Sequence, residues 1–323
     1  MDYQVVKPVV VVSKCLGFDS CRYNGAIISD EFIVALKPHI LFITVCPEMG
    51  IGLGVPREPI RIVVSGGKRL LYQPAARKDV SREMTVYVTS FLDSLGRVDG
   101  FILKYKSPSC GIENVKMYPA IEAQTPKEKG AGFFGEEAIS RFSHLAVEDE
   151  RRLKTFRIRE HFLTKLFALA RFRELRENPS MKALIEFHSR NKLLFMSYSQ
   201  SKSKVLGNIT ANHEHKNIRE VMKLYFQTMT ELFQNPARRS SIINVLEHTF
   251  GGVSMELSPP EKRFFSKSVQ DYREKKVPLS VPLNLLHSWA LRFETEYLLI
   301  QTFIEPYPSA LMDISDSGKG RDL

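Results

Sequence analysis

GFILKYKSPSCG, residues 100–111, joins a short apolar run to a turn that contains a cysteine. The apolar run at its start is typical of a buried strand. Pro108 ends the strand because proline lacks a backbone donor, and Gly111 lets the chain turn closely around whatever Cys110 holds. We therefore expect Cys110 to lie just beyond the end of a strand.

Two other cysteines occupy the same kind of position. Cys15 follows the apolar run Pro8–Ser13, and Cys46 ends the run that starts at Ile40. In an open α/β sheet, ligands collect beyond the carboxyl ends of the strands. Three thiols at three such ends can meet around one object, which we interpret as an iron–sulfur cluster. The competing interpretation for each cysteine is that it fills the core, as buried cysteines often do.

The composition is that of an ordinary globular protein. The chain has 323 residues, of which 43% are hydrophobic and 25% charged, and this length allows two domains. No run approaches the roughly 20 apolar residues of a membrane span, and the N-terminus lacks the apolar core of a signal peptide. We expect a cytoplasmic protein without a membrane partner, in which the cysteines are reduced, metal-bound or inert.

The net charge of +10 comes entirely from the second part of the chain. Residues 1–150 carry 18 basic and 18 acidic side chains, whereas residues 151–323 carry 28 basic and 18 acidic ones. All four cysteines lie in the neutral part. This division predicts a reaction centre in the first part and a polyanion-binding surface in the second. A solubilising helical surface would produce the same charge.

The order of the expected elements indicates two domains. Strands alternate with helices up to Cys110, which predicts an α/β domain with a mostly parallel sheet over residues 1–148. We expect a hairpin at Ser65–Lys68 and a loop over the glycine-containing residues 125–135.

From about residue 149 the pattern is helical with few glycines, so residues 149–314 are expected to form an all-α domain. Ser199–His215 is expected to be a polar connection between helices. Residues 315–323 are expected to be a disordered tail.

Three separated blocks of sequence resemble a known family. They are SKCLG with CRYNG at residues 13–25, VCPE with GVPR at residues 45–57, and SPSCG at residues 107–111. In this order they resemble the signature of the thiouracil desulfidase family, and three ordered blocks are far more specific than one short motif. The helical remainder resembles a once uncharacterised domain that is often fused behind it.

The resemblance implies a [4Fe-4S] cluster held by only three cysteines, which here would be Cys15, Cys46 and Cys110. Cys21 would then pack beside the cluster, the alternative being a fourth ligand in a resting state. Fusions of this kind resemble desulfidases that act on 4-thiouridine in transfer RNA. The expected reaction is therefore hydrolysis of 4-thiouridine in tRNA to uridine and sulfide, with tRNA and not DNA as the partner.

The chemistry of such a site favours the same reaction. Three thiolates leave one iron with an open position, which acts as a Lewis acid. Thiocarbonyl sulfur is a soft ligand that suits this iron. Glu48, two residues beyond Cys46, is the best-placed carboxylate for general acid/base catalysis, and capping a loop amide is its alternative role.

The residues that lead into Cys110 supply further candidates. Lys104 and Lys106 are expected on one face of the strand, where a lysine near the cluster would polarise the remaining carbonyl. The alternative for either is a solvated strand end. Ser107 and Ser109 are expected to donate hydrogen bonds to cluster sulfurs or to the base.

Basic residues are expected to contact the phosphates of RNA. Arg238 and Arg239 are included because they open a predicted helix, where positive charge opposes the dipole unless an anion is near. An ordinary salt bridge is the alternative for Arg57. The full set is Arg22, Arg57, Arg151, Arg152, Lys154, Arg157, Arg159, Arg171, Arg173, Lys202, Lys204, Arg238 and Arg239.

Three other functions fit parts of this pattern. The first is a desulfidase of free thiolated bases or nucleosides, with the helical domain used for dimerisation. The second is a non-enzymatic RNA-binding sensor whose iron–sulfur cluster reports oxygen or iron. The third is a zinc protein without iron–sulfur chemistry.

Overall fold

The computed structural model describes residues 6–313 and residue 315. The chain forms two compact units, Met1–Lys154 and Thr155–Leu323. The division falls a few residues beyond the expected position at residue 148, because a strand that ends at Asp149 still pairs within the first unit. The expected disordered tail, residues 315–323, lies outside the described residues except for Ser315.

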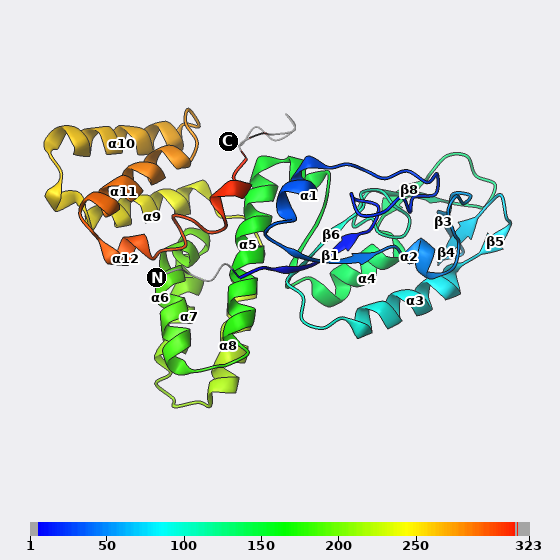
Figure 1. Cartoon of the computed structure of the whole chain (residues 1–323), viewed down its shortest axis with the longest axis horizontal. Coiled ribbons are helices and arrows are strands. Elements are labelled where there is room, and N and C mark those ends of the chain that lie inside the picture. Colours follow the sequence, from blue (N-terminus) through cyan, green and yellow to red (C-terminus); the bar gives the residue numbers. More distant parts are fainter. Residues whose placement is uncertain (1–5, 314, 316–323) are drawn as a thin grey trace. The chain divides into compact units, whose positions relative to one another are not determined.

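The first unit is built on a parallel sheet of four strands, as expected for an α/β domain. Its strand order is β2-β1-β6-β9, and its two central strands, β1 and β6, are labelled in Figure 1. The apolar runs of β1 and β6 are buried almost throughout, as is typical of parallel strands covered on both faces. The strands are β1 (Val9–Ser13), β2 (Leu41–Val45), β6 (Gly100–Leu103) and β9 (Ala146–Asp149).

Four helices connect or cover these strands. Asp30 caps the first helix, because its carboxylate accepts hydrogen bonds from the backbone amides of Phe32 and Ile33. The rings of Phe91 and Phe134 pack the third helix against the fourth, with centroids 5.7 Å apart. The helices are α1 (Glu31–Leu36), α2 (Pro47–Gly50), α3 (Ser81–Ser94) and α4 (Phe133–Phe142).

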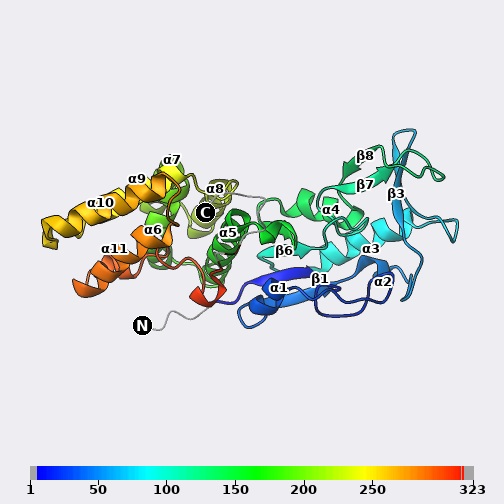
Figure 2. The ribbon, with the colours of Figure 1, turned by 90° about the horizontal axis from the view of Figure 1, so that it is seen from above.

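A second sheet of five strands completes the first unit (Figure 2). The hairpin expected at Ser65–Lys68 is present, since those two residues pair across antiparallel strands. Residues 128–130, which we expected within a loop, instead form an edge strand that pairs with β7. The strands are β3 (Arg61–Ser65), β4 (Lys68–Gln73), β5 (Lys78–Asp79), β7 (Val115–Tyr118) and β8 (Glu128–Gly130), in the order β5-β4-β3-β7-β8.

The second unit is helical throughout its described residues, which confirms the all-α prediction. Its core holds a cluster of aromatic rings, in which Phe172 and Tyr225 stack with centroids 5.5 Å apart. The helices are α5 (Phe156–Leu175), α6 (Met181–Tyr198), α7 (Gln200–Ala211), α8 (Ile218–Leu232), α9 (Arg239–Gly251), α10 (Pro259–Arg273), α11 (Ser280–Arg292) and α12 (Glu296–Leu299).

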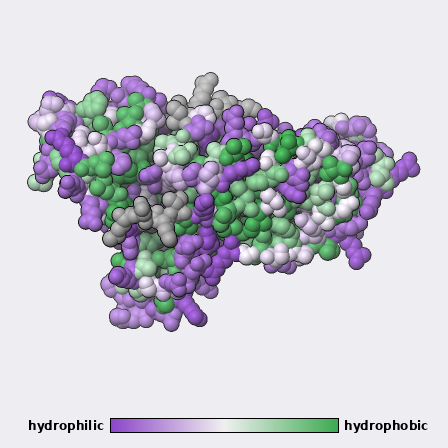
Figure 3. All heavy atoms as spheres, in the orientation of Figure 1, coloured by the Kyte–Doolittle hydropathy of each residue, from purple (hydrophilic) through white to green (hydrophobic). Residues whose placement is uncertain are grey.

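The expected polar connection over Ser199–His215 is wrong, because most of it forms helix α7. Ser199 caps that helix by accepting a hydrogen bond from the amide of Lys202, and Leu206 is fully buried. The buried residues Ser203, Leu206 and Thr210 anchor α7, whose other faces are polar. The composition of this helix therefore resembles that of a loop. Figure 3 shows hydrophilic side chains gathered around the connection between α7 and α8.

No helix within the described ranges has the length and apolar character needed to cross a bilayer.

Candidate functional site

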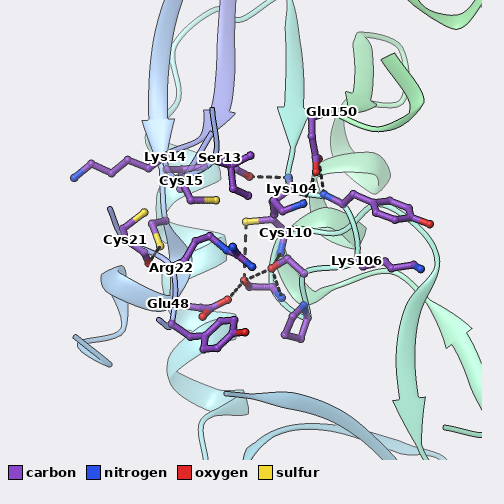
Figure 4. Close-up of a pocket in the computed structure, with 18 of the residues that line it drawn as sticks. Ser13, Lys14, Cys15, Cys21, Arg22, Glu48, Lys104, Lys106, Cys110 and Glu150 are labelled. Carbon is purple, nitrogen blue, oxygen red and sulfur yellow. Dashed lines mark hydrogen bonds and ion pairs between the residues drawn. The ribbon is translucent and has the colours of Figure 1, made fainter. Parts of the chain in front are cut away.

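Three cysteines lie at the carboxyl edge of the parallel sheet in the first unit. Cys15 follows β1, Cys46 directly follows β2, and Cys110 lies in the loop after β6. These three strands are neighbours in the sheet, so their loops emerge side by side. All three cysteines line one cavity of about 570 Å³ (Figure 4).

The loop that carries Cys110 rests on the start of helix α4. The amide of Phe134 donates to the carbonyl of Ser109 at 2.8 Å. A Cβ atom on Gly135 would lie only 2.2 Å from the carbonyl oxygen of Gly111, so only glycine allows this approach. The cysteine is therefore placed by a segment more than twenty residues further along the chain. Sequence reasoning missed this role of Gly135, although its glycine-rich surroundings are a signal of close backbone packing.

Glu48 connects the loop of Cys46 to the loop of Cys110. Its Oε1 atom accepts a hydrogen bond from the Ser109 hydroxyl at 2.7 Å. Its Oε2 atom lies 2.7 Å from a guanidinium nitrogen of Arg57. The carboxylate is only 13% exposed, so these two partners hold it in a defined orientation at the cavity wall.

Arg57 is a buried anchor of the site. Its side chain is 3% exposed, and its guanidinium also donates to the carbonyls of Cys21 at 3.0 Å and Gly54 at 2.8 Å. This corrects the expectation that Arg57 contacts RNA, because every direction of the guanidinium faces protein. The alternative of a salt bridge is the one observed, with Glu48 as the partner.

Ser107 shapes the turn that presents Cys110. Its hydroxyl oxygen accepts hydrogen bonds from the amides of Ser109 at 3.3 Å and Cys110 at 3.1 Å. It also lies 2.9 Å from the Ser109 hydroxyl, which extends the network that begins at Glu48. The two serines therefore hold the loop and the carboxylate together.

Lys104 is paired with Glu150, a residue that sequence reasoning missed. The ammonium group of Lys104 donates to the carboxylate of Glu150, which also accepts from the amide of Tyr105 at 2.7 Å. The amide of Lys104 itself donates to the Ser13 hydroxyl at 2.9 Å. Glu150 directly follows β9, the neighbour of β6, so the rule of strand ends would have found it had β9 been predicted.

Lys106 does not share a strand face with Lys104, contrary to our expectation. Strand β6 ends at Leu103, and Lys106 has a φ of 56°, in the left-handed region. Its ammonium group lies 5.0 Å from the centroid of the Tyr105 ring. Figure 4 shows the Lys106 side chain pointing away from the cysteines, whereas Lys104 lies beside Cys110.

The thiols of Cys15 and Cys110 are difficult to ionise in this cavity. Burial, with the neighbouring Cys46 as the next cause, raises the pKa of Cys15 to about 11. Burial also raises the pKa of Cys110 well above its usual value, and a hydrogen bond to Ser13 offsets only part of this. Three crowded thiols that repel one another as anions are a donor set that a cationic iron centre would stabilise.

The spacing of these donors differs from that of a mononuclear site. Across residues 6–313 no three His, Cys, Asp or Glu side chains are close enough to hold a single metal ion. Iron–sulfur clusters are held by cysteine thiolates, and the cavity offers donors of this kind from three separate loops.

Cys21 lies beside this set. Burial, followed by the charge of Cys46, raises its pKa to about 12, and its carbonyl lies 3.9 Å from the sulfur of Cys46. Cys21 is 2% exposed and also lines the cavity, a placement that fits both packing beside a cluster and ligation as a fourth donor.

The mouth of the cavity carries several of the basic residues expected to contact RNA. The Arg22 guanidinium lies 5.6 Å from the centroid of the Tyr23 ring. Arg151 is exposed, and its guanidinium lies 5.5 Å from the centroid of Tyr105. Lys154 is 60% exposed and lies 3.9 Å from a carboxylate oxygen of Asp30. Arg151 and Lys154 are therefore accessible to an anion, whereas Arg22 is half-buried in the cavity lining.

The remaining basic residues of the set are placed differently. Arg159 is 3% exposed, which corrects the expectation that it contacts RNA. Arg157, Arg238 and Arg239 line a separate cavity of the second unit, and Lys204 is exposed on α7. The other members pair within the protein: Arg152 with Glu148 and Glu113, Arg171 with the Pro306 carbonyl, Arg173 with Glu174, and Lys202 with Glu231.

Comparison with known proteins divides the chain in a similar way. A family model described as 2-thiouracil desulfurase matches residues 10–150. A second model, described as a protein of unknown function (DUF1722), matches residues 192–308.

Two curated relatives are similar to parts of the chain. YbbK of Bacillus subtilis strain 168, described as uncharacterized, is 34% identical over 110 residues, which cover 32% of this chain and 73% of YbbK. YbgA of Escherichia coli strain K12, also described as uncharacterized, is 28% identical over 151 residues, covering 46% of this chain and 89% of YbgA.

One solved structure is also similar, that of the [4Fe-4S]-dependent thiouracil desulfidase TudS. It is 25% identical with a TM-score of 0.35, and the match covers 46% of this chain and 93% of that one.

Proposed function

The chain belongs, through residues 10–150, to the 2-thiouracil desulfurase family, and on this premise we propose that it is an iron–sulfur desulfidase of 4-thiouridine in transfer RNA. The proposed reaction is hydrolytic: water replaces the thiocarbonyl sulfur, giving uridine and sulfide. One observation carries the proposal. Three cysteines from three strand ends line one cavity together with a hydrogen-bonded carboxylate and a lysine.

Cys15, Cys46 and Cys110 would hold a [4Fe-4S] cluster, with Cys21 packed behind Cys46. When bound, such a cluster supplies an iron with an open position that accepts thiocarbonyl sulfur as a Lewis acid. The raised pKa values of the Cys15 and Cys110 thiols support this assignment, because these two thiolates are costly until a cationic centre compensates them.

Glu48 is the proposed general acid and base. Its carboxylate takes a proton from the water that attacks the thiocarbonyl carbon and returns it to the departing sulfur, so that both protons of the water end on sulfide. The Ser109 hydroxyl and the Arg57 guanidinium hold the two carboxylate oxygens at 2.7 Å each, which fixes the direction of this proton transfer.

Lys104 is proposed to steady negative charge that develops on the base during attack. Glu150 positions the ammonium group beside Cys110 and is itself only 6% exposed. Lys106 is not assigned this role because its side chain points away from the cysteines. It belongs with the cations at the cavity mouth.

The basic mouth of the cavity supports a polynucleotide substrate. Arg22, Arg151 and Lys154 line a cavity whose volume, about 570 Å³, suits one nucleoside and not a base-paired stem. The target nucleotide would have to leave its stack, at a cost of about a few kcal/mol. Phosphate contacts by these cations would offset that cost and make binding dependent on salt.

The test uses the full chain, purified without oxygen and analysed for iron and acid-labile sulfide. We expect sulfide release from tRNA that contains 4-thiouridine, with an apparent affinity that falls as salt rises. Replacing both Arg151 and Lys154 with alanine should weaken tRNA binding about tenfold and lower the salt slope. The matched control replaces Arg97 and Lys129, two exposed cations of the same unit outside the cavity, and should change neither.

Two results would contradict the proposal. Sulfide release from free 4-thiouridine as fast as from tRNA, without salt dependence, would favour a desulfidase of free thiolated compounds. The family's description, 2-thiouracil desulfurase, is the observation that favours this second candidate. A preparation that contains iron but releases sulfide from neither substrate would favour a non-catalytic sensor.

A further inference from the structure

The second unit contains a cavity of its own, formed without any cysteine. Its volume is about 460 Å³, within the range of small-molecule sites. Its walls come from helices α5, α6 and α9, the end of α10, the start of α11 and the segment that follows α12. Several separate segments therefore converge on one space.

Four aromatic side chains contribute to the walls of this cavity. Phe156, Tyr198, Tyr272 and Phe303 all line it. The Arg239 guanidinium lies 4.5 Å from the centroid of the Tyr272 ring and donates to the backbone carbonyl of the same residue. This double contact holds the Tyr272 ring in place. A ring held in this way is a ready surface for a flat ligand.

The charge of the lining is strongly positive. Among the described residues, four cations line the cavity, Arg157, Arg238, Arg239 and Lys275, against the one carboxylate of Glu160. Such a lining favours an anionic ligand.

Arg238 and Arg157 are the cations whose surroundings are best defined. Arg238 is exposed, and within the described residues its guanidinium has no hydrogen-bond or ion-pair partner. It is also the N-cap residue of α9, so its charge adds to the positive end of the helix dipole. The charge of Arg157 acts on both His161 and Tyr272, which places it near the same space.

The polar groups of the inner wall are supported by their neighbours. His161 Nδ1 lies 3.1 Å from the Tyr198 hydroxyl, and the carboxylate of Glu160 accepts a hydrogen bond from the hydroxyl of Tyr307. Glu160 keeps acceptor capacity for a ligand, because a carboxylate has more lone pairs than this one contact uses. The amino or imino N–H of a nucleobase is a donor of the required kind.

We propose that this cavity is a second binding site, which takes a nucleoside monophosphate unit. The phosphate lies against Arg157, Arg238 and Lys275, and the base lies against Tyr272 with its N–H edge toward Glu160. A phosphate alone leaves the aromatic walls without a contact, and a neutral base leaves the cations without one. The unit is either a free nucleotide or the terminal nucleotide of an RNA, and both present the same chemistry.

The test is calorimetric titration of the full chain with uridine 5′-monophosphate, uridine and inorganic phosphate. We expect saturable binding of the nucleotide, at least tenfold tighter than either of its parts. The Arg238→Ala variant should bind the nucleotide about tenfold more weakly. The Ala237→Trp variant leaves the charges intact and fills the cavity, so it should abolish binding.

The matched control is Arg263→Ala, which removes an exposed arginine of α10 outside the cavity and should leave the affinity unchanged. The two sources are separated by one RNA sequence prepared with and without a 5′-phosphate. Competition between the phosphorylated RNA and the nucleotide assigns the site to an RNA end, and its absence assigns it to free nucleotides.

Three outcomes would overturn the proposal: no saturable binding of the nucleotide, binding that survives both variants, or equal affinities for nucleotide and phosphate. The probes contain no sulfur, so this result is independent of the desulfidase proposal. Sulfide release measured on the same preparations reports that proposal separately.

Discussion

The two cavities of this chain are built from different kinds of contact. In the first unit the polar groups are buried and held by several neighbours, as Arg57 is by three partners at 3% exposure. In the second unit the cations line a cavity together with four aromatic side chains, and Arg238 is exposed. A reacting group must keep its orientation within narrow limits, whereas a phosphate contact tolerates small displacements. The comparison associates chemistry with the first cavity and binding with the second.

Replacing Cys110 should have the largest effect and tests whether the first cavity depends on its thiols. We expect Cys110→Ala to lose its iron and to release no measurable sulfide, because the cluster would keep only two protein ligands. Iron analysis and a sulfide assay measure both. Cys21→Ala is the control and should keep both iron and activity. Loss of iron from the Cys21 variant would instead make that residue a fourth ligand.

Glu48→Gln tests the proton-transfer role within the same network. The amide has nearly the same shape and still accepts the hydrogen bond from Ser109, but it cannot take up a proton. We expect kcat to fall by about 10²- to 10³-fold with the iron content unchanged. Steady-state kinetics beside iron analysis separate the two effects. A variant with unchanged kcat would remove Glu48 from the mechanism.

Gly135→Ala tests how rigidly the first cavity is assembled. The added Cβ atom would meet the carbonyl oxygen of Gly111 at 2.2 Å, so helix α4 or the Cys110 loop must move. We expect the free energy of unfolding of the first unit to fall by about 3 kcal/mol and iron binding to weaken. Gly96→Ala is the matched control, because a Cβ there meets nothing within 4 Å. Equal stability of the two variants, measured by denaturant unfolding, would contradict the packing argument.

The response to acid should sharpen the contrast between the units. Burial lowers the pKa of His161 and of His188 to about 4 each, so in the second unit both residues are neutral when folded. Below pH 6.5, the usual pKa of about 6.5 for histidine, the two histidines bind protons in the unfolded chain but stay neutral in the folded chain. The second unit should therefore lose stability from pH 6.5 to pH 4, on the order of 2–3 kcal/mol for His161.

The first unit contains a buried carboxyl whose effect on stability changes with pH in the opposite direction. Burial raises the pKa of Asp149 to about 6. As pH falls from 6 toward 4, the folded chain protonates this carboxyl before the unfolded chain does, so its contribution to the stability of the folded state increases. Hydrogen exchange at pH 7, 5.5 and 4.5 follows the two units separately. We expect the amides of α5 and α6 to lose protection first. The His161→Gln variant should flatten their pH dependence, and an unchanged dependence would rule out this histidine as its cause.

The alternation of strands and helices up to Cys110 could be predicted because each apolar run there ends at a visible turn residue. The same rule identified the cysteines, since Cys15, Cys46 and Cys110 each follow such a run. It failed for β9, a short strand with acidic residues, and Glu150 was missed with it. It also failed at Ser199–His215, where a few buried side chains within a polar segment are enough to anchor α7.

The sequence by itself determined the fold class, the edge of the sheet where the thiols lie and the uneven distribution of charge, because these follow from periodicity and composition along the chain. Only the tertiary structure decided which polar groups meet. It paired Arg57 with Glu48, Lys104 with Glu150 and Gly135 with Gly111, and it placed Arg157 and Arg238 on one cavity. Contacts between distant segments depend on how helices and loops pack in three dimensions, and no local pattern of residues records them.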